Sequence, residues 1–401
     1  MTPLLALALA LAAGLAVTRL PLPRLRHSLS RELVLAAGAP LVLVGLLLGP
    51  GLGVLDPTAL RSLAPVTALG IGWIGAVFGG RAQLEWRFLR RIPARVWGLA
   101  AIQAAAVLVL TVLTARLLTR AVPALATVWH PTLPALLTLA AAAITSGPGA
   151  VALVARATGV RTSVARVLGR AAMLDTMFGT LVFMLALGLY HPRQPFAGAL
   201  LGSAHWVAVA VAASGGVGVL FLWLSRLRAD PRELGLDLLG VMLLAAGVGY
   251  AADLSPFVVC ALATALIVNV SPRKRQVRAQ LHAWEGPIYA VVLIVAGALL
   301  NLPTVWLLPA ALLLAMVRVV ARWVAVRFGQ EWLNARDLPP DAGLATVAQG
   351  AAAPALALSF NLIYAGSGTL VTTVLVGVAL AQAVAGPLMA LALRPAPAEV
   401  R

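Results

Sequence analysis

Acidic residues and cysteines are scarce in this sequence. Its 401 residues include 13 Asp and Glu against 30 Lys and Arg, and charged residues make up 11% of the chain, where a soluble domain carries about 25%. The single cysteine, Cys260, excludes an intramolecular disulfide and a cysteine-based metal cluster. The five histidines are scattered, with no pair at the spacing of metal ligands. No resident metal and no cofactor are therefore expected.

Apolar residues take the place of the missing charge. They make up 61% of the chain, and apolar runs recur from end to end that are each long enough to cross a bilayer as a helix. The runs are continuous rather than alternating, which favours helices over the strands of a barrel. The first run, LLALALALAAGLAV, is not preceded by a basic residue and is predicted to be a retained helix rather than a signal peptide. The composition predicts an all-α polytopic membrane protein.

Hydropathy and Gly/Pro punctuation predict about thirteen spans, and twelve or fourteen remain open because 235–270 and 284–327 divide in more than one way. The expected ranges are 3–19, 34–54, 62–80, 95–119, 127–156, 164–190, 197–225, 235–251, 254–270, 284–300, 303–327, 342–364 and 368–393. No hydrophilic stretch is long enough to fold by itself. We therefore expect one membrane domain over 1–401 and no cytoplasmic regulatory domain.

The basic residues alternate between loops. Loops after odd-numbered spans hold 24 of the 30, loops after even-numbered spans hold 4, and Arg318 and Arg322 lie inside the 303–327 span. The positive-inside rule then predicts a multi-pass protein of the cell (inner) membrane with its N-terminus outside and its C-terminus in the cytoplasm. The net charge of +17 is explained by this orientation, so no nucleic-acid partner is expected.

Two predicted spans are interrupted. Span 127–156 contains Thr145, Ser146, Gly147, Pro148 and Gly149, and span 342–364 contains Gln349, Gly350 and Pro354. Proline removes a backbone donor and glycine weakens a helical turn. Interrupted helices at corresponding positions in two halves of a chain indicate a transporter site at the middle of the membrane. The alternative is a pair of ordinary proline kinks.

Asp175 is a lone carboxylate within the apolar span 164–190. A carboxylate at the centre of a membrane helix costs roughly 2.5–3.5 kcal/mol on insertion scales, so such a residue indicates a functional site. Arg318 and Arg322 are four residues apart and share one helical face. An ion pair between Asp175 and Arg318 would neutralise both charges, and such a pair can also serve the structure alone.

Four parts of the chain resemble the cation:proton antiporter superfamily, in the branch of bacterial sodium/proton exchangers and Kef-type potassium efflux proteins. They are VGLLLGPGLGVLDP (44–57), GWIGAVFGGRAQLEWRFLRR (72–91), the 145–179 segment around the first interruption and Asp175, and the pair VRVVARWVAVRFG (317–329) and ATVAQGAAAPALAL (345–358). They occur in the family's order and span most of the chain.

The resemblance implies a fold of two inverted repeats, each ending in three helices of which the middle one is broken. The two broken helices cross in a core, expected at about 95–190 and 303–393, which moves against a scaffold formed by the remainder, usually in a homodimer. It also implies secondary active transport that exchanges a monovalent cation (Na⁺, Li⁺ or K⁺) for protons by alternating access.

The sequence departs from the family at the ion site. Members carry Asp-Asp or Asn-Asp in the equivalent of span 164–190, and the second aspartate binds the ion and the proton. Here Asp175 takes the first position and Thr176 the second, while Arg318 takes the position of the usual partner of the first aspartate. Ala351 and Ala352 replace the Gly-Glu of Kef-like proteins.

Oxygens of Thr145, Ser146 and Thr176 can ligate a hard cation together with Asp175. A hydroxyl cannot exchange a proton near neutral pH, so Asp175 alone could carry the proton. The alternative is a transport-inactive or altered-specificity protein of the same fold, such as a leak pathway, a sensor or an organic-ion carrier. An enzyme is not expected, because an intramembrane aspartyl protease needs two deep carboxylates and no HExxH motif occurs.

Overall fold

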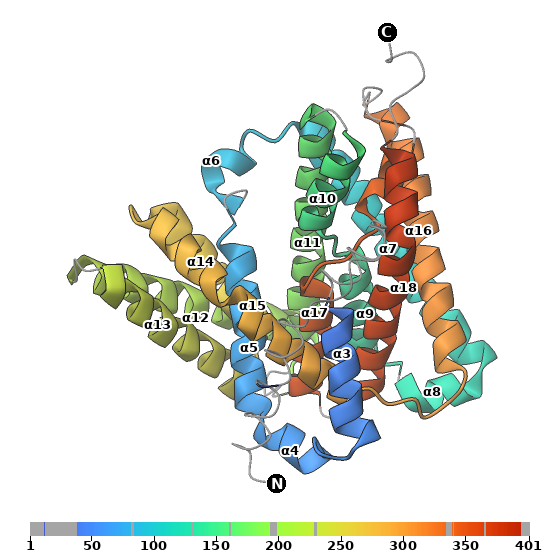
Figure 1. Cartoon of the computed structure of the whole chain (residues 1–401), viewed down its shortest axis with the longest axis horizontal. Coiled ribbons are helices and arrows are strands. Elements are labelled where there is room, and N and C mark those ends of the chain that lie inside the picture. Colours follow the sequence, from blue (N-terminus) through green and yellow to red (C-terminus); the bar gives the residue numbers. More distant parts are fainter. Residues whose placement is uncertain are drawn as a thin grey trace.

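A computed structural model describes residue 12 and residues 38–393, except 82–83, 130, 160–161, 193–198, 228–230, 334–338, 340 and 365. The described residues form helices joined by short connections, and no strand occurs among them (Figure 1). The all-α prediction is confirmed. The first predicted span, 3–19, lies outside the described residues apart from residue 12.

The other twelve predicted spans each correspond to a helix or a broken helix. The single long helices are α7 (Ala94–Ala121), α11 (Thr162–Leu189), α12 (Ala199–Leu227), α13 (Pro231–Ala251), α15 (Lys274–Ala298), α16 (Leu307–Trp332) and α18 (Gly368–Ala392). Shorter helices are α3 (Ala39–Leu46), which continues as the turn η1 (Leu47–Gly51), and α4 (Pro57–Ser62), α5 (Ala64–Gly79), α6 (Trp86–Leu89), α8 (Pro123–Trp129) and α14 (Pro256–Val270). Within the described part, eight elements are long and apolar enough to cross a membrane.

Both interrupted spans are broken in the structure. The first consists of α9 (Leu133–Ile144) and α10 (Pro148–Thr158), with three non-helical residues between them. Pro148 is the first residue of α10, where a missing N–H costs nothing. The second consists of η3 (Ala342–Thr346) and α17 (Ala352–Ile363). Pro354 lies in the first turn of α17 rather than in the break itself, so residues 347–351 form the interruption.

The two broken helices belong to two groups of three that run in opposite directions. The first group is α7, α9–α10 and α11, and the second is α16, η3–α17 and α18. In Figure 1, α10 lies at the top of the molecule and α17 lies towards the bottom, so the halves after the two breaks point opposite ways. Helix α7 packs on α16, α9 packs on α11 and α17, and α18 packs on η3 and α17. The two groups therefore form one body around the breaks.

A second set of helices packs beside this body. Helix α14 lies against α5, α15 lies against α3 and α5, and α12 and α13 cover α14. Glycines make the α5–α14 contact close, because a Cβ on Gly75 or Gly79 would lie 2.1 Å from the carbonyl oxygen of Phe257 or 2.0 Å from that of Ala261. Helix α17 also packs on α5, which joins the two sets of helices.

Candidate functional site

The two helix breaks touch each other. The backbone N–H of Gly147 in the first break donates to the carbonyl oxygen of Ala348 in the second, at 2.8 Å. A Cβ on Gly147 would lie 3.2 Å from the carbonyl oxygen of Gln349, and a Cβ on Gly350 would lie 3.4 Å from the Cα atom of Gly147. A methyl group on Gly147 would therefore press on the second break, whereas one on Gly350 would make an ordinary van der Waals contact with the first.

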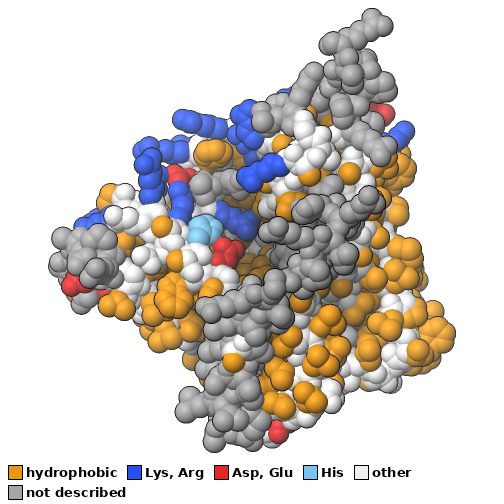
Figure 2. Space-filling model, viewed as in Figure 1, with side chains coloured by type: hydrophobic (Ala, Val, Ile, Leu, Met, Phe, Trp, Pro, Cys, Tyr) orange, Lys and Arg blue, Asp and Glu red, His pale blue; other side chains and the backbone are white. Residues whose placement is uncertain are grey.

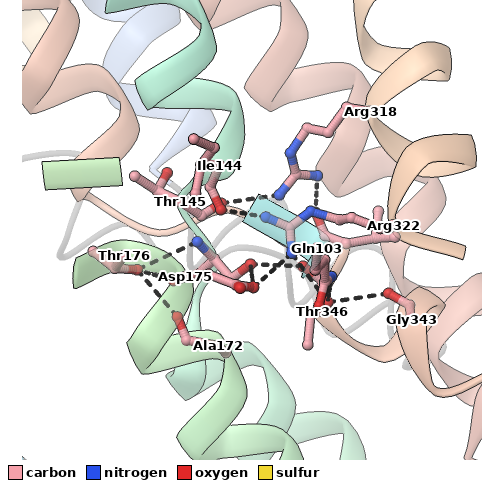
Figure 3. Close-up of polar contacts among 12 residues, drawn as sticks. Gln103, Ile144, Thr145, Ala172, Asp175, Thr176, Arg318, Arg322, Gly343 and Thr346 are labelled. Carbon is pink, nitrogen blue, oxygen red and sulfur yellow. Dashed lines mark hydrogen bonds and ion pairs between the residues drawn. The ribbon is translucent and has the colours of Figure 1, made fainter. Parts of the chain in front are cut away.

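Asp175 lies beside this crossing in a sealed polar network (Figure 3). Its Oδ2 atom accepts from Nη1 of Arg322 at 2.7 Å and from the hydroxyl of Ser146 at 2.9 Å. The exposed fractions of the Arg322 and Asp175 side chains are 1% and 0%. The second carboxylate oxygen, Oδ1, is buried and has no hydrogen-bond partner among the described residues.

The predicted ion pair between Asp175 and Arg318 is wrong, because Arg322 is the partner. Arg318 instead donates to three backbone carbonyls, those of Ala143 at 2.6 Å, Thr145 at 2.9 Å and Val347 at 2.5 Å. Carbonyls at the end of a helix have no partner within the helix and carry its negative dipole. Arg318 thus lies level with the end of α9 and the turn after η3.

Arg322 contacts the same helix end and the carboxylate together. Its Nη2 atom donates to the carbonyl oxygen of Ile144, and its Nη1 atom also lies 3.1 Å from the hydroxyl oxygen of Thr346. Arg322 therefore keeps acceptors other than Asp175 within reach. Both arginines are almost completely buried, at 2% and 0% exposure.

Thr176 ties its helix to the first break. Its hydroxyl lies within donating distance of the carbonyl oxygens of Ser146 (2.9 Å) and Ala172 (3.2 Å), and it accepts from the backbone N–H of Ser146 (3.3 Å). Thr145 uses its hydroxyl on the carbonyl of Ala142 in its own helix, at 2.8 Å. The structure thus brings Asp175, Thr176 and Ser146 together, while the Thr145 side chain is turned back towards α9.

Sequence reasoning missed the polar residues that complete this network. The amide of Gln103 on α7 donates to the hydroxyl of Thr346 at 2.7 Å, and that hydroxyl lies 3.0 Å from the carbonyl oxygen of Gly343 (Figure 3). Gln382 on α18 donates to the carbonyl oxygen of Gln349 in the second break. Gln103 and Gln382 are each a lone amide in an otherwise apolar stretch, and that pattern is the signal that could have identified them.

A cavity of about 510 Å³, called the funnel below, reaches the crossing from outside the protein. Its lining includes the buried side chains of Ser146, Thr176 and Gln382, and the glycines Gly147 and Gly350. Its mouth is lined by Arg81, His282 and Glu285, and Nδ1 of His282 lies 2.8 Å from Oε2 of Glu285. Figure 2 shows a histidine, an acidic and a basic side chain at the edge of a hollow, below a region rich in Lys and Arg.

The described helices therefore bring together two crossed helix breaks and a buried carboxylate–guanidinium pair in one bundle. Solved structures of a sodium/proton antiporter have the same fold. The chain superposes on the sodium/proton antiporter MjNhaP1 from Methanocaldococcus jannaschii at pH 8 with a TM-score of 0.66 and 16% sequence identity, covering 98% of both chains. A second structure of that antiporter, from electron microscopy, gives a TM-score of 0.65 at 16% identity, covering 98% of this chain and 97% of that one. No protein-family model and no curated protein matches the sequence.

Proposed function

We propose that the protein exchanges a monovalent cation for protons across the membrane by alternating access. The observation that carries this proposal is the Asp175–Arg322 pair, sealed beside two crossed helix breaks. The funnel reaches the neighbouring residues Ser146 and Thr176. A carboxylate at such a depth is expensive to keep, and here it is the one titratable acid beside the crossing among the described residues. The fold shared with a sodium/proton antiporter supports the proposal.

In the proposed mechanism Asp175 alternates between a proton and the cation. The deprotonated carboxylate accepts from Arg322 and from Ser146 through Oδ2, and its Oδ1 atom is unpartnered. That oxygen is where a proton or a cation binds. When Asp175 is protonated, Arg322 retains the carbonyl oxygen of Ile144 and the hydroxyl of Thr346. The pair can therefore open without leaving the guanidinium wholly unsatisfied, which a buried charge could not tolerate.

In the membrane, the proposed transporter consists of a moving core and a scaffold. The helices over 95–190 and 303–393 form the moving core, and the remaining helices form the scaffold of a homodimer. The funnel is proposed to open to the cytoplasm, because Arg81, at the start of the basic 81–95 region, lines it together with His282 and Glu285 of α15, and cytoplasmic loops are rich in Lys and Arg. With this orientation the proposed state is inward-open, and the C-terminus lies in the cytoplasm.

A second candidate function is altered specificity, with an organic anion as the transported species. Two buried guanidinium groups, Arg318 and Arg322, stand beside one carboxylate, Asp175, and the partial charges of the helix ends that meet here are of both signs and offset each other. Because Thr176 stands where the family has a second aspartate, one positive charge remains unbalanced among the described residues of the crossing. An anion at the end of the funnel would balance it.

Flux measurements in liposomes separate the two candidates. Purified protein should acidify or alkalinise the vesicle interior when a Na⁺, Li⁺ or K⁺ gradient is imposed, and gradients of a carboxylate such as acetate or benzoate should produce no protein-dependent flux. Control vesicles contain the protein heated to inactivate it. Flux driven only by the organic anions would replace the cation proposal with the second candidate.

A further inference from the structure

We infer that Gln382 on α18 is a direct ligand of the transported cation through its side-chain carbonyl oxygen. The inference rests on the proposed cation exchange and adds to it a residue and a role that the resemblance does not supply. It places an uncharged oxygen on the funnel wall, separate from the carboxylate that carries the proton.

The orientation of the Gln382 amide is fixed by its surroundings. The side chain is 3% exposed, and its Nε2 group donates to the backbone carbonyl oxygen of Gln349 at 2.5 Å. Only the NH₂ end of the amide can face a carbonyl oxygen, so Oε1 must point away from Gln349. That oxygen is buried and has no hydrogen-bond partner among the described residues. Leaving a buried acceptor unsatisfied costs about 1–3 kcal/mol, which indicates that something else binds it.

The position of Gln382 mirrors that of Thr176 in the other repeat. Thr176 lies on α11, the third helix of the first group, and its hydroxyl bonds to the backbone of Ser146 in the first break. Gln382 lies on α18, the third helix of the second group, and bonds to the backbone of Gln349 in the second break. The two residues thus hold the two breaks from equivalent places, and both line the funnel.

Thr176 and Gln382 differ in how much of each side chain remains available to bind a ligand. The Thr176 hydroxyl is engaged with two carbonyl oxygens and one N–H, so little of it remains for a ligand. The Gln382 amide uses one donor and keeps a whole carbonyl oxygen. Na⁺, Li⁺ and K⁺ are hard cations that prefer oxygen ligands. An amide oxygen attracts such a cation without titrating, so Gln382 is expected to set cation affinity and selectivity but not the pH dependence of exchange.

Two substitutions at this position separate a ligand from a structural clamp. Gln382→Met has similar length and removes both the donor to Gln349 and the free oxygen. Gln382→Glu removes the donor but keeps oxygens and adds a negative charge. The matched control is Gln330→Met on α16, because Gln330 is also a buried glutamine (8% exposed) whose amide donates to a backbone carbonyl, that of Pro339 at 2.7 Å, and it does not line the funnel.

Exchange is measured in liposomes with Na⁺, Li⁺ and K⁺ in turn, and cation-dependent shifts in thermal unfolding are measured on the same purified proteins. We expect Gln382→Met to raise the apparent KM for the cation about tenfold, the loss of roughly one good ligand contact, with an unchanged pH profile. Gln382→Glu should lower KM or leave it unchanged, and Gln330→Met should match the wild type.

Failure of the ligand role of Gln382 and failure of the proposed exchange would give different results. Wild-type exchange with an unchanged KM in Gln382→Met overturns the role of Gln382 and leaves the exchange proposal standing. Equal impairment in the Met and Glu variants also overturns it, because the lost donor would then be responsible. A wild type without flux, but with cation stabilisation that Gln382→Met abolishes, supports the ligand and rejects exchange. A wild type with neither flux nor stabilisation rejects both.

Discussion

Nη1 of Arg322 lies 2.7 Å from Oδ2 of Asp175, and neither side chain reaches solvent. Arg318, one helical turn earlier, is committed to backbone carbonyls at the ends of α9 and η3. The two arginines of α16 therefore have different partners: Arg318 donates to carbonyls at helix ends, while Arg322 contacts a helix end and the carboxylate together. Because the two arginines have different partners, substituting each one separately should change the stability of the protein in a different way.

A double-mutant cycle should show that Asp175 is coupled to Arg322 more strongly than to Arg318. Removing one partner of a buried pair leaves an uncompensated charge, which costs about 3–5 kcal/mol. Asp175→Asn and Arg322→Gln should each be strongly destabilising, and the double variant should lose much less than the sum. Unfolding in detergent is the measurement. A larger coupling in the parallel cycle with Arg318→Gln would contradict the assignment of the pair.

Gly147 and Gly149 should respond oppositely to a single added methyl group. A Cβ at Gly147 would press on the backbone of the second break at 3.2–3.3 Å, whereas a Cβ at Gly149 would meet nothing within 4 Å. We expect Gly147→Ala to destabilise the protein by about 1 kcal/mol, the lower end of overpacking costs. Gly149→Ala should be neutral or stabilising by up to about 1 kcal/mol, because glycine is costly in a helix. Thermal unfolding of both variants checks this, and equal effects would show that the breaks are not in contact.

Glu85 should contribute to stability at neutral pH and lose that contribution in acid. It lies in the connection after α5 and bonds to Lys274 at 2.6 Å and to Arg278 at 2.5 Å. Burial would raise the pKa of this carboxyl, but the hydrogen bonds and charges of Lys274 and Arg278 prevail and hold the pKa below its ordinary value of 4.5.

A carboxyl whose pKa is lower in the folded state stabilises fully above its unfolded pKa and loses that effect as pH falls through the folded pKa. Glu85→Gln should therefore be less stable than the wild type at pH 7, by about 1 kcal/mol for a partly exposed group. The difference should shrink as pH falls below 4.5. Unfolding temperatures measured between pH 7 and pH 3 check the trend, and a difference that grows in acid would contradict it.

The proposed orientation predicts which loops react with impermeant thiol reagents. In a Cys260→Ala background, Gln276→Cys at the exposed start of α15 should be labelled only after the membrane is permeabilised. Thr58→Cys, exposed in the short α4 that precedes α5, should be labelled from outside intact cells. The reverse pattern would invert the orientation and place the funnel mouth outside.

Much of the fold could be predicted, because membrane helices are recognisable in a sequence from the length and hydropathy of their apolar runs and from the arginines in the loops between them. The interruptions could be predicted as well, since Gly147, Pro148 and Gly350 break helices by their own backbone chemistry. The partner of Asp175 could not be determined in the same way. Arg318 and Arg322 share one face, and a shift of one turn, about 6 Å along the axis, decides which of them meets the carboxylate. That shift depends on how α16 packs on α7 and η3, which no local pattern encodes.

The central claim is that Asp175 carries the exchanged proton, and exchange by Asp175→Asn in liposomes tests it most directly. The substitution keeps size and hydrogen bonding and removes the titratable proton. We expect wild-type protein to move protons against a Na⁺, Li⁺ or K⁺ gradient, Asp175→Asn to move none, and Thr176→Asp, which restores a second carboxylate, to move more than the wild type. Full exchange by Asp175→Asn would contradict the account.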